Sequence, residues 1–234
     1  MYRMFGVRLF DLEFIKKNPS FLAGCDEVGR GPLAGPVVAC CAFWNLQNEK
    51  EANEVLKNLS QLGVTDSKGL SEKKREVIVE KLGLTQLESG KNSIFGPSIF
   101  NSLSFRIEEV SAFEIDEINI LQASLLAMLR AYEGLSKSHT YAEGILLIDG
   151  NKKLSGGLGQ PIVKGDAKSL VIGLASIIAK VYRDRLMKEL GRLYPEYGFA
   201  ENAGYPTEKH RKAIQEIGPT PIHRKTFKGV KEYL

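Results

Sequence analysis

Two acidic residues, Asp26 and Glu27, stand side by side at the end of an apolar run and directly before the turn Gly29-Arg30-Gly31. Adjacent carboxylates repel each other and are costly to remove from water, so a folded chain tolerates them best beside a cation. Glycines on both sides of an arginine let backbone N–H groups come close to an anion, while the guanidinium neutralises its charge. The segment therefore predicts a metal site next to a turn that binds phosphate or sugar, with a nucleic-acid backbone as its target.

The same turn also fits the relaxed dinucleotide-binding fingerprint G-x-G-x-x-A over residues 29–34. That fingerprint requires a helix to begin inside the motif, with the pyrophosphate at its N-terminus. Here Pro32 and Pro36 bracket the turn, and residues 37–43 (VVACCAF) are typical of a strand. A nucleotide-cofactor site is therefore disfavoured. A P-loop is excluded, because no Gly-Lys-Ser or Gly-Lys-Thr follows the turn.

The order of predicted elements indicates an α/β fold. Residues 21–28 and 37–43 are predicted to be strands that pair as a hairpin across the Gly/Pro turn. Ser71 is a good N-cap for a helix over 72–82, which Gly83 ends. The other predicted elements are a strand within 100–110, an amphipathic helix over 115–132, strands at 144–149 and 161–163, a helix over 169–193 with a buried first half, and a short helix near 207–217.

Two further acids follow predicted strands: Asp149 ends an apolar strand, and Asp166 lies between a strand and a buried helix. Carboxylates at strand ends of an α/β sheet point toward the crevice where ligands bind. Together with Asp26 and Glu27 they would form an oxygen-only site suited to Mg²⁺ or Mn²⁺. Strand alternation sends neighbouring side chains to opposite faces, so we expect the first strand to end or bulge at Asp26 and Glu27. The alternative is that Asp149 and Asp166 cap turns or helices and that the other two are surface acids paired with Arg30 or lysines.

Positive charge is concentrated near the C-terminus. The whole chain carries a net charge of +4. Residues 203–234 contain three glutamates and the basic residues Lys209, Arg211, Lys212, Arg224, Lys225, Lys228 and Lys231. Such a basic segment on a neutral body indicates a polyanionic partner, and a merely solvated tail is the alternative. His210 and His223 lie in this segment, where phosphate contact or surface exposure is expected, and His139 is expected to be solvated.

The cysteine pattern bears on the cellular compartment. Cys25, Cys40 and Cys41 make an odd count with an adjacent pair, which is a poor disulfide framework. Arg3 and Arg8 interrupt the apolar residues of the N-terminal segment, so it does not resemble a signal peptide, and no uncharged stretch is predicted to span a membrane. We therefore expect a cytoplasmic protein without membrane association, acting as a monomer.

Several blocks of the sequence, in order, resemble the ribonuclease HII (type 2 ribonuclease H) family. The resemblance covers most of the chain: residues 26–38 (DEVGRGPLAGPVV), 66–71 (DSKGLS), 114–121 (EIDEINIL), 147–151 (LIDGN), 163–166 (VKGD), 175–184 (ASIIAKVYRD), 197–199 (YGF) and 204–207 (GYPT).

The resemblance implies a ribonuclease H-like mixed β-sheet flanked by helices. Residues 1–193 would form the catalytic domain, and 194–234 a basic, helical C-terminal segment packed on it. The metal-binding catalytic acids would be Asp26, Glu27, Asp149 and Asp166. Substrate-binding residues would be Gly29, Arg30 and Gly31 at the ribose 2′-hydroxyl, Lys68, and Tyr205 at the sugar of the following deoxynucleotide.

By the same resemblance, the activity would be a Mn²⁺- or Mg²⁺-dependent endoribonuclease. Its substrates would be RNA in RNA–DNA hybrids and ribonucleotides embedded in duplex DNA. The 2′-hydroxyl is the only group that distinguishes RNA from DNA at such a site, which gives a tight glycine-lined turn a physical purpose. Two rival hypotheses remain: a related nuclease, such as a junction resolvase, that needs no 2′-hydroxyl, and a basic nucleic-acid-binding module whose acids are structural.

Overall fold

A mixed β-sheet forms the centre of the molecule in the computed structural model, which describes residues 10–17, 19–96, 100–137 and 143–234. Within these residues, six strands follow the order β3-β4-β2-β1-β5-β6. They are β1 (Phe21–Val28), β2 (Val37–Asn45), β3 (Asn92–Ile94), β4 (Leu103–Val110), β5 (Ile145–Asp149) and β6 (Gln160–Ile162). The pairs β1–β2, β2–β4 and β3–β4 are antiparallel, whereas β1–β5 and β5–β6 are parallel.

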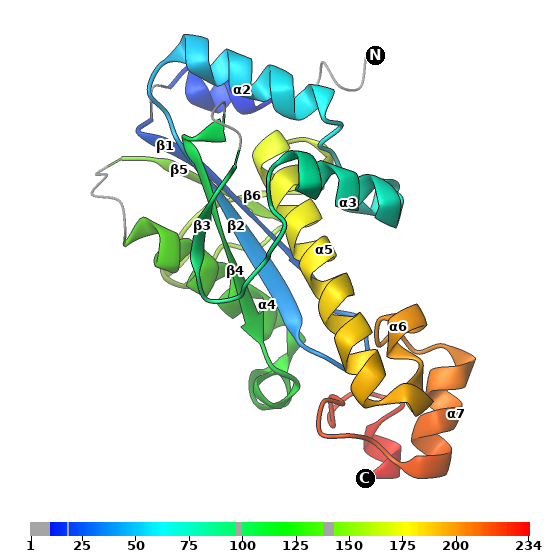
Figure 1. Cartoon of the computed structure of the whole chain (residues 1–234). Coiled ribbons are helices and arrows are strands. Elements are labelled where there is room, and N and C mark those ends of the chain that lie inside the picture. The colour runs from blue at the N-terminus through cyan, green and yellow to red at the C-terminus, as the bar shows by residue number, and fades with distance from the viewer. Residues whose placement is uncertain (1–9, 18, 97–99, 138–142) are drawn as a thin grey trace.

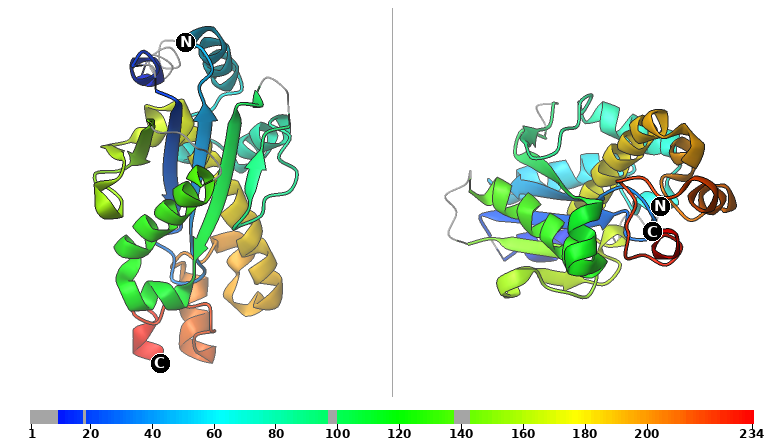
Figure 2. Two further views of the ribbon diagram at one scale, coloured as in Figure 1. Left: turned by 90° about the vertical axis from the view of Figure 1, so that its left-hand side faces the viewer. Right: turned by 90° about the horizontal axis from the view of Figure 1, so that it is seen from below.

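Two long helices, α4 and α5, cover opposite faces of this sheet (Figures 1 and 2). Besides a helical stretch at residues 10–15, the α-helices of the described residues are α2 (Glu49–Gln61), α3 (Glu72–Lys81), α4 (Ala112–Ser136), α5 (Leu170–Leu193), α6 (Phe199–Asn202) and α7 (Glu208–Ile217). A capping box between Ser111 and Glu114 begins α4, and the Ser169 hydroxyl caps α5 by accepting from the Ile172 N–H. These local signals fix where each long helix begins.

Strand alternation divides the core between the two faces. Leu22 and Leu147 pack in the cluster on the α5 side, whereas Ala23 and Ile148 pack in the cluster on the α4 side. Each central strand is therefore buried on both faces, which explains its nearly continuous apolar sequence. The first half of α5 is buried as predicted, since residues 169–179 are all buried.

A third apolar cluster joins the C-terminal segment to the loop that follows β1. Leu33 and Ala34 of that loop pack with Met187 of α5 and with Phe199 and Ile214 of the C-terminal segment. In Figure 1 this segment, coloured orange to red, lies at the C-terminal end of α5. The loop after β1 is thus held between the β-sheet and the C-terminal segment.

The predicted α/β order is confirmed, including the hairpin of β1 and β2 and the helices α3, α4, α5 and α7. Sequence analysis missed α2, although Asn48 caps it and it buries a regular apolar face. Its many charged residues concealed that face. The N-terminal residues considered above as a signal peptide lie, except for residue 10, outside the described residues, as does His139.

Candidate active site

The register of β1 and β5 brings two of the predicted acids together. The parallel pairing ends with Cys25 opposite Ile148, so Asp26 and Asp149 are the next residues on adjacent strands. Asp26 lies four residues after Leu22, and Asp149 lies two residues after Leu147, both of which belong to the α5-side cluster. Because residues an even number of positions apart share a face of a strand, both acids lie on the α5 side of the sheet. Asp26 is buried, with 6% of its surface exposed. Two carboxylates thus meet where β5 ends.

The prediction that β1 ends or bulges at Asp26 and Glu27 is wrong where β1 pairs with β2. The antiparallel pairing continues in register, with Asp26 opposite Cys40 and Glu27 opposite Ala39. Only the pairing with β5 stops, because β1 extends beyond it. Alternation still directs Glu27 away from Asp26. The charge of Asp149 nevertheless acts on Glu27, and Nη1 of Arg30 lies 3.3 Å from Oε1 of Glu27.

The short 3-10 turn η4 (Gly165–Ala167) supplies the fourth predicted acid and holds the third. Oδ1 of Asp149 accepts the Gly165 N–H at 2.7 Å and the Asp166 N–H at 3.3 Å. Asp166 is buried, and its Oδ1 accepts the Ala167 N–H at 2.9 Å. The capping interpretation of Asp149 and Asp166 is therefore correct for one oxygen of each carboxylate. The contact of Asp149 with η4 brings Asp166 close to Asp149, which in turn lies next to Asp26.

Burial, together with repulsion between carboxylates, raises the proton affinity of Asp26, Glu27 and Asp166. Burial, followed by repulsion from Glu27 and Asp149, raises the pKa of Asp26 well above its ordinary value. Burial also raises the pKa of Glu27 against the opposing effect of Arg30, and burial with repulsion from Asp149 raises the pKa of Asp166. Among the described residues, no three His, Cys, Asp or Glu side chains could hold a metal ion as they stand. A cation would relieve the repulsion, and the oxygen-only donors suit a hard divalent ion.

Lys68 lies close enough to the acid cluster for the carboxylates to change its pKa. It belongs to the turn η1 (Ser67–Gly69), which a 2.8 Å hydrogen bond between the hydroxyls of Ser67 and Ser176 ties to α5. Partial burial alone would lower the pKa of Lys68, but attraction to nearby carboxylates, first Asp166 and then Asp26, raises it. The ammonium group is exposed to solvent, so it is available to a negatively charged ligand.

The two glycines of the Gly29-Arg30-Gly31 turn differ in backbone conformation and in the space available for a side chain. Gly29 has φ +93°, and a Cβ there would lie 2.2 Å from Nε of Arg183. Gly31 has no positive φ, and its added Cβ would lie 3.4 Å from the Tyr205 ring, an ordinary contact distance. The fold therefore requires glycine at 29, whereas it leaves room for a methyl group at 31.

Tyr205 lies over this turn, half-exposed at 42% of its surface. Two buried histidines hold its backbone. The Thr220 N–H donates to Nδ1 of His223, which leaves the proton of His223 on Nε2, and this Nε2–H donates to Nε2 of His210 at 3.0 Å. Nδ1–H of His210 in turn donates to the Tyr205 carbonyl at 2.9 Å. The expectation of surface or phosphate-binding histidines is wrong. Burial lowers the pKa of both, that of His223 to about 4, so both are neutral at pH 7.

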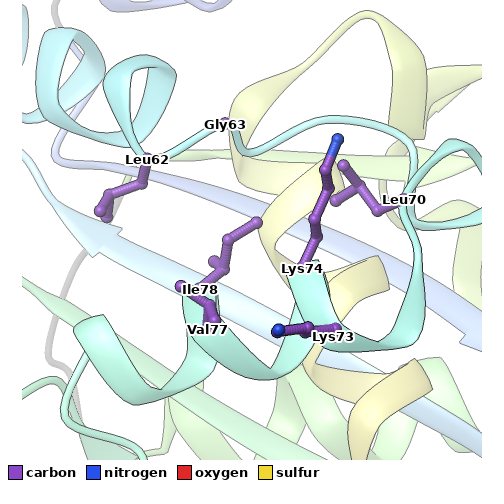
Figure 3. Close-up of a pocket in the computed structure, with 7 residues that line it drawn as sticks. All are labelled: Leu62, Gly63, Leu70, Lys73, Lys74, Val77 and Ile78. Carbon is purple, nitrogen blue, oxygen red and sulfur yellow. The ribbon is translucent and has the colours of Figure 1, made fainter.

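One apolar groove lies apart from the acids, between the end of α2 and the outer face of α3 (Figure 3). Its lining consists of Leu62, Gly63, Leu70, Lys73, Lys74, Val77 and Ile78. It contains no carboxylate and hence no ligand for a hard cation. The described helices include none that is long and apolar enough to cross a membrane.

The fold and the acid cluster define a ribonuclease H-like protein. The crystal structure of ribonuclease H2 from Pyrococcus horikoshii OT3 matches with a TM-score of 0.62 and 27% identity, covering 91% of this chain and 96% of that one. The Bst ribonuclease HIII structure in complex with Mn²⁺ shares the fold at a TM-score of 0.67 and 18% identity, covering 91% of this chain and 68% of that one.

Sequence comparison then identifies the family. The family model described as "Ribonuclease HII" matches residues 23–230. Ribonuclease HII from Magnetococcus marinus is 44% identical over 216 residues, which cover 91% of this chain and 87% of that protein. The chain belongs to the ribonuclease HII family, as the sequence blocks had indicated, and is a ribonuclease H nuclease.

Proposed function

We propose that this enzyme is a divalent-metal-dependent endonuclease that cleaves RNA in RNA–DNA hybrids and cuts on the 5′ side of ribonucleotides embedded in duplex DNA. The observation that supports this best is the adjacency of Asp26 and Glu27, near the end of β1, to the Gly29–Gly31 turn that follows them in the chain. A group that senses a 2′-hydroxyl in the turn would lie next to the groups that act on the neighbouring phosphate. Selectivity and hydrolysis are thus coupled by a few residues of chain.

In this proposal the metal ligands are Asp26, Glu27, Asp149 and Asp166. Their oxygen-only chemistry suits Mg²⁺ or Mn²⁺, and the Mn²⁺ complex of the structurally similar Bst ribonuclease HIII is consistent with that choice. A divalent ion bound there would activate water and stabilise the developing negative charge on phosphate. Because Asp149 accepts from η4 through Oδ1, its Oδ2 remains for this task.

The remaining site residues bind and orient the substrate. The backbone at Gly29 and Gly31, with Arg30 beside it, would contact the 2′-hydroxyl and its phosphate, Lys68 a phosphate, and Tyr205 the following deoxyribose. The reaction adds water across one phosphodiester. The water oxygen bonds to phosphorus, the bond to the 3′-oxygen of the preceding nucleotide breaks, and the products carry a 3′-hydroxyl and a 5′-phosphate.

The basic C-terminal segment would contact the duplex backbone. Its basic side chains are exposed except for Arg224, which is buried. Neutralising Lys209, Arg211 and Lys212 on α7 should weaken duplex binding and flatten its dependence on salt, since each lost phosphate contact removes about one released counterion. An unchanged salt dependence would mean that these charges only solvate the surface. The three buried, free cysteines are consistent with the cytoplasm as the site of action, and we propose a monomer there.

The decisive experiment compares cleavage of three substrates with and without Mg²⁺ or Mn²⁺: a DNA duplex with one ribonucleotide, the same duplex entirely of DNA, and a four-way DNA junction. We expect metal-dependent cleavage of the first alone. Cleavage of the junction would favour a resolvase, and tight binding without cleavage would favour a binding module.

The shared acid site is tested by four single variants. Each should lose most activity yet remain folded: Asp26→Asn, Glu27→Gln, Asp149→Asn and Asp166→Asn. Near-wild-type activity in any two of them would rule out a single site.

A further inference from the structure

Two fully buried arginines, Arg183 of α5 and Arg224 of the C-terminal segment, lie behind the Gly29–Pro36 loop. Neither forms an ion pair with a carboxylate in the described part of the chain. Burial lowers the pKa of Arg183 to about 10 and that of Arg224 to about 9, so both are charged at neutral pH. A buried, unpaired charge is costly, and hydrogen bonds must compensate for it.

All of their hydrogen bonds go to backbone carbonyls of the loop and of the residue before Gly204. Arg224 donates to the carbonyls of Gly29 at 2.5 Å, Arg30 at 2.9 Å and Gly35 at 3.1 and 3.0 Å. Arg183 donates to those of Pro36 at 3.1 Å, Ala34 at 3.2 Å and Ala203 at 3.0 Å. The planar guanidinium fork suits such multiple, fixed contacts, which an ammonium group cannot reproduce.

These contacts orient the turn. The carbonyls of Gly29 and Arg30 point inward, so the N–H groups of the same two peptides, those of Arg30 and Gly31, point outward. The N–H groups of Gly29, Arg30 and Gly31 donate no hydrogen bond within the described chain. Successive free N–H groups form a concave surface that binds oxygen anions and hydroxyls. Arg183 also blocks any side chain at position 29, which keeps the turn in this shape.

The same cations connect the turn to Tyr205. Arg183 bridges the loop to the Ala203 carbonyl, and the Leu33 N–H donates to the Gly204 carbonyl at 2.8 Å. The Tyr205 ring then faces Gly31. The spacing between the exposed N–H groups and the ring is therefore set by the Arg183 guanidinium and by this backbone hydrogen bond rather than by the exposed side chains.

We propose that Arg183 and Arg224 are positioning residues for ribonucleotide selectivity: they hold the Gly29–Gly31 N–H groups and Tyr205 in the arrangement that distinguishes a ribose from a deoxyribose. This inference rests on the proposed function. Neither arginine contacts the substrate, and each acts through the backbone it binds. Weakening either contact set should therefore reduce discrimination between sugars while leaving the acid cluster intact.

The test measures Kd for a duplex with one ribonucleotide and for the all-DNA duplex, both without divalent metal so that no cleavage occurs. Arg224→Lys and Arg183→Lys keep the charge but lose the planar guanidinium group. We expect each to lower the preference for the ribonucleotide duplex, measured as the Kd of the all-DNA duplex divided by the Kd of the ribonucleotide duplex, at least tenfold. Arg185→Lys is the matched control, because Arg185 lies on the same helix and pairs with Glu76 at the surface. It should keep the wild-type ratio.

Each outcome is informative. If the wild-type enzyme shows no preference for the ribonucleotide duplex, the proposed function fails rather than the positioning role. If it shows a preference that both lysine variants retain, the positioning role is overturned. If one variant does not fold, the other decides. If neither folds, the arginines serve the fold alone and the proposal is also overturned.

Discussion

Replacing Gly29 and Gly31 by alanine separates what the fold requires of the turn from what the substrate requires. At Gly29, the φ of +93° disfavours a residue with a Cβ by about 1–3 kcal/mol. The added Cβ would also displace Arg183, whose charged hydrogen bonds contribute about 1.5–3 kcal/mol each. We expect Gly29→Ala to lose about 3 kcal/mol of stability or more. In a chain of this size that loss lowers the melting temperature by about 6–12 °C.

Gly31→Ala should behave in the opposite way. Its Cβ would make only an ordinary contact with the Tyr205 ring at 3.4 Å, and its backbone needs no positive φ, so stability should change by no more than about 0.5 kcal/mol. The methyl group would nevertheless stand where we expect a ribose to approach. A displacement of about 1 Å at the reacting group costs about 100-fold in rate, and we expect that loss in kcat/KM.

Thermal melting of both variants and initial rates on a duplex with one ribonucleotide check this reasoning. Wild-type cleavage by Gly31→Ala would refute the close approach of the sugar to the turn. A loss of melting temperature in Gly31→Ala equal to that in Gly29→Ala would refute the available space at position 31.

Three further predictions concern buried and half-buried groups. Burial raises the pKa of Asp11 to about 7, so below that pH the native protein holds a proton that the unfolded chain has released. As the pH rises from 5 to 8, the unfolding free energy of the wild type should therefore fall by about 3 kcal/mol relative to that of Asp11→Asn. Burial, and then the charge of His210, lowers the pKa of His223 to about 4, so the unfolded chain takes up a proton at about pH 6.5 that the native protein does not. As the pH falls from 7 to 5, the unfolding free energy of the wild type should therefore fall by about 2 kcal/mol relative to that of His223→Gln. Chemical denaturation across pH tests both, and a constant difference would contradict the burial of either group. Tyr205→Ala should slow cleavage of a DNA-embedded ribonucleotide more than cleavage of continuous RNA; equal losses with a lower melting temperature would indicate a packing role only.

Local sequence signals predicted most of the fold. The apolar runs of β1, β2 and β5 and the cap at Ser71 determine structure within a few residues, so no knowledge of the tertiary fold was needed. The nearness of Asp26 to Asp149 depends instead on the parallel pairing of strands far apart in sequence. The strand-end positions of the acids suggested it, but the residues alone left capping and surface roles open, and the family resemblance then favoured the shared site.

Several of the errors and omissions concern polar groups that the fold buries. His210 and His223 lie in a charged segment, and residue type alone favours exposure there. Arg183 could have been found from helical spacing, since Ile172, Ala179 and Met187 on the same face of α5 are all buried. No comparable periodicity surrounds Arg224, and its burial follows only from tertiary packing.

The contacts between Arg224 and the loop after β1 also constrain the order in which the protein folds. The carbonyls of Gly29, Arg30 and Gly35 are separated from Arg224 by 195, 194 and 189 residues. Contacts of such separation require a large loss of chain entropy and form late. During synthesis, β1, β5 and η4 precede Arg224 along the chain, so their acids can assemble while the turn is still free to sample other shapes. Arrival of Arg224 then fixes the turn, so under the proposed function a nascent chain would assemble its proposed metal ligands before its proposed substrate-selecting turn.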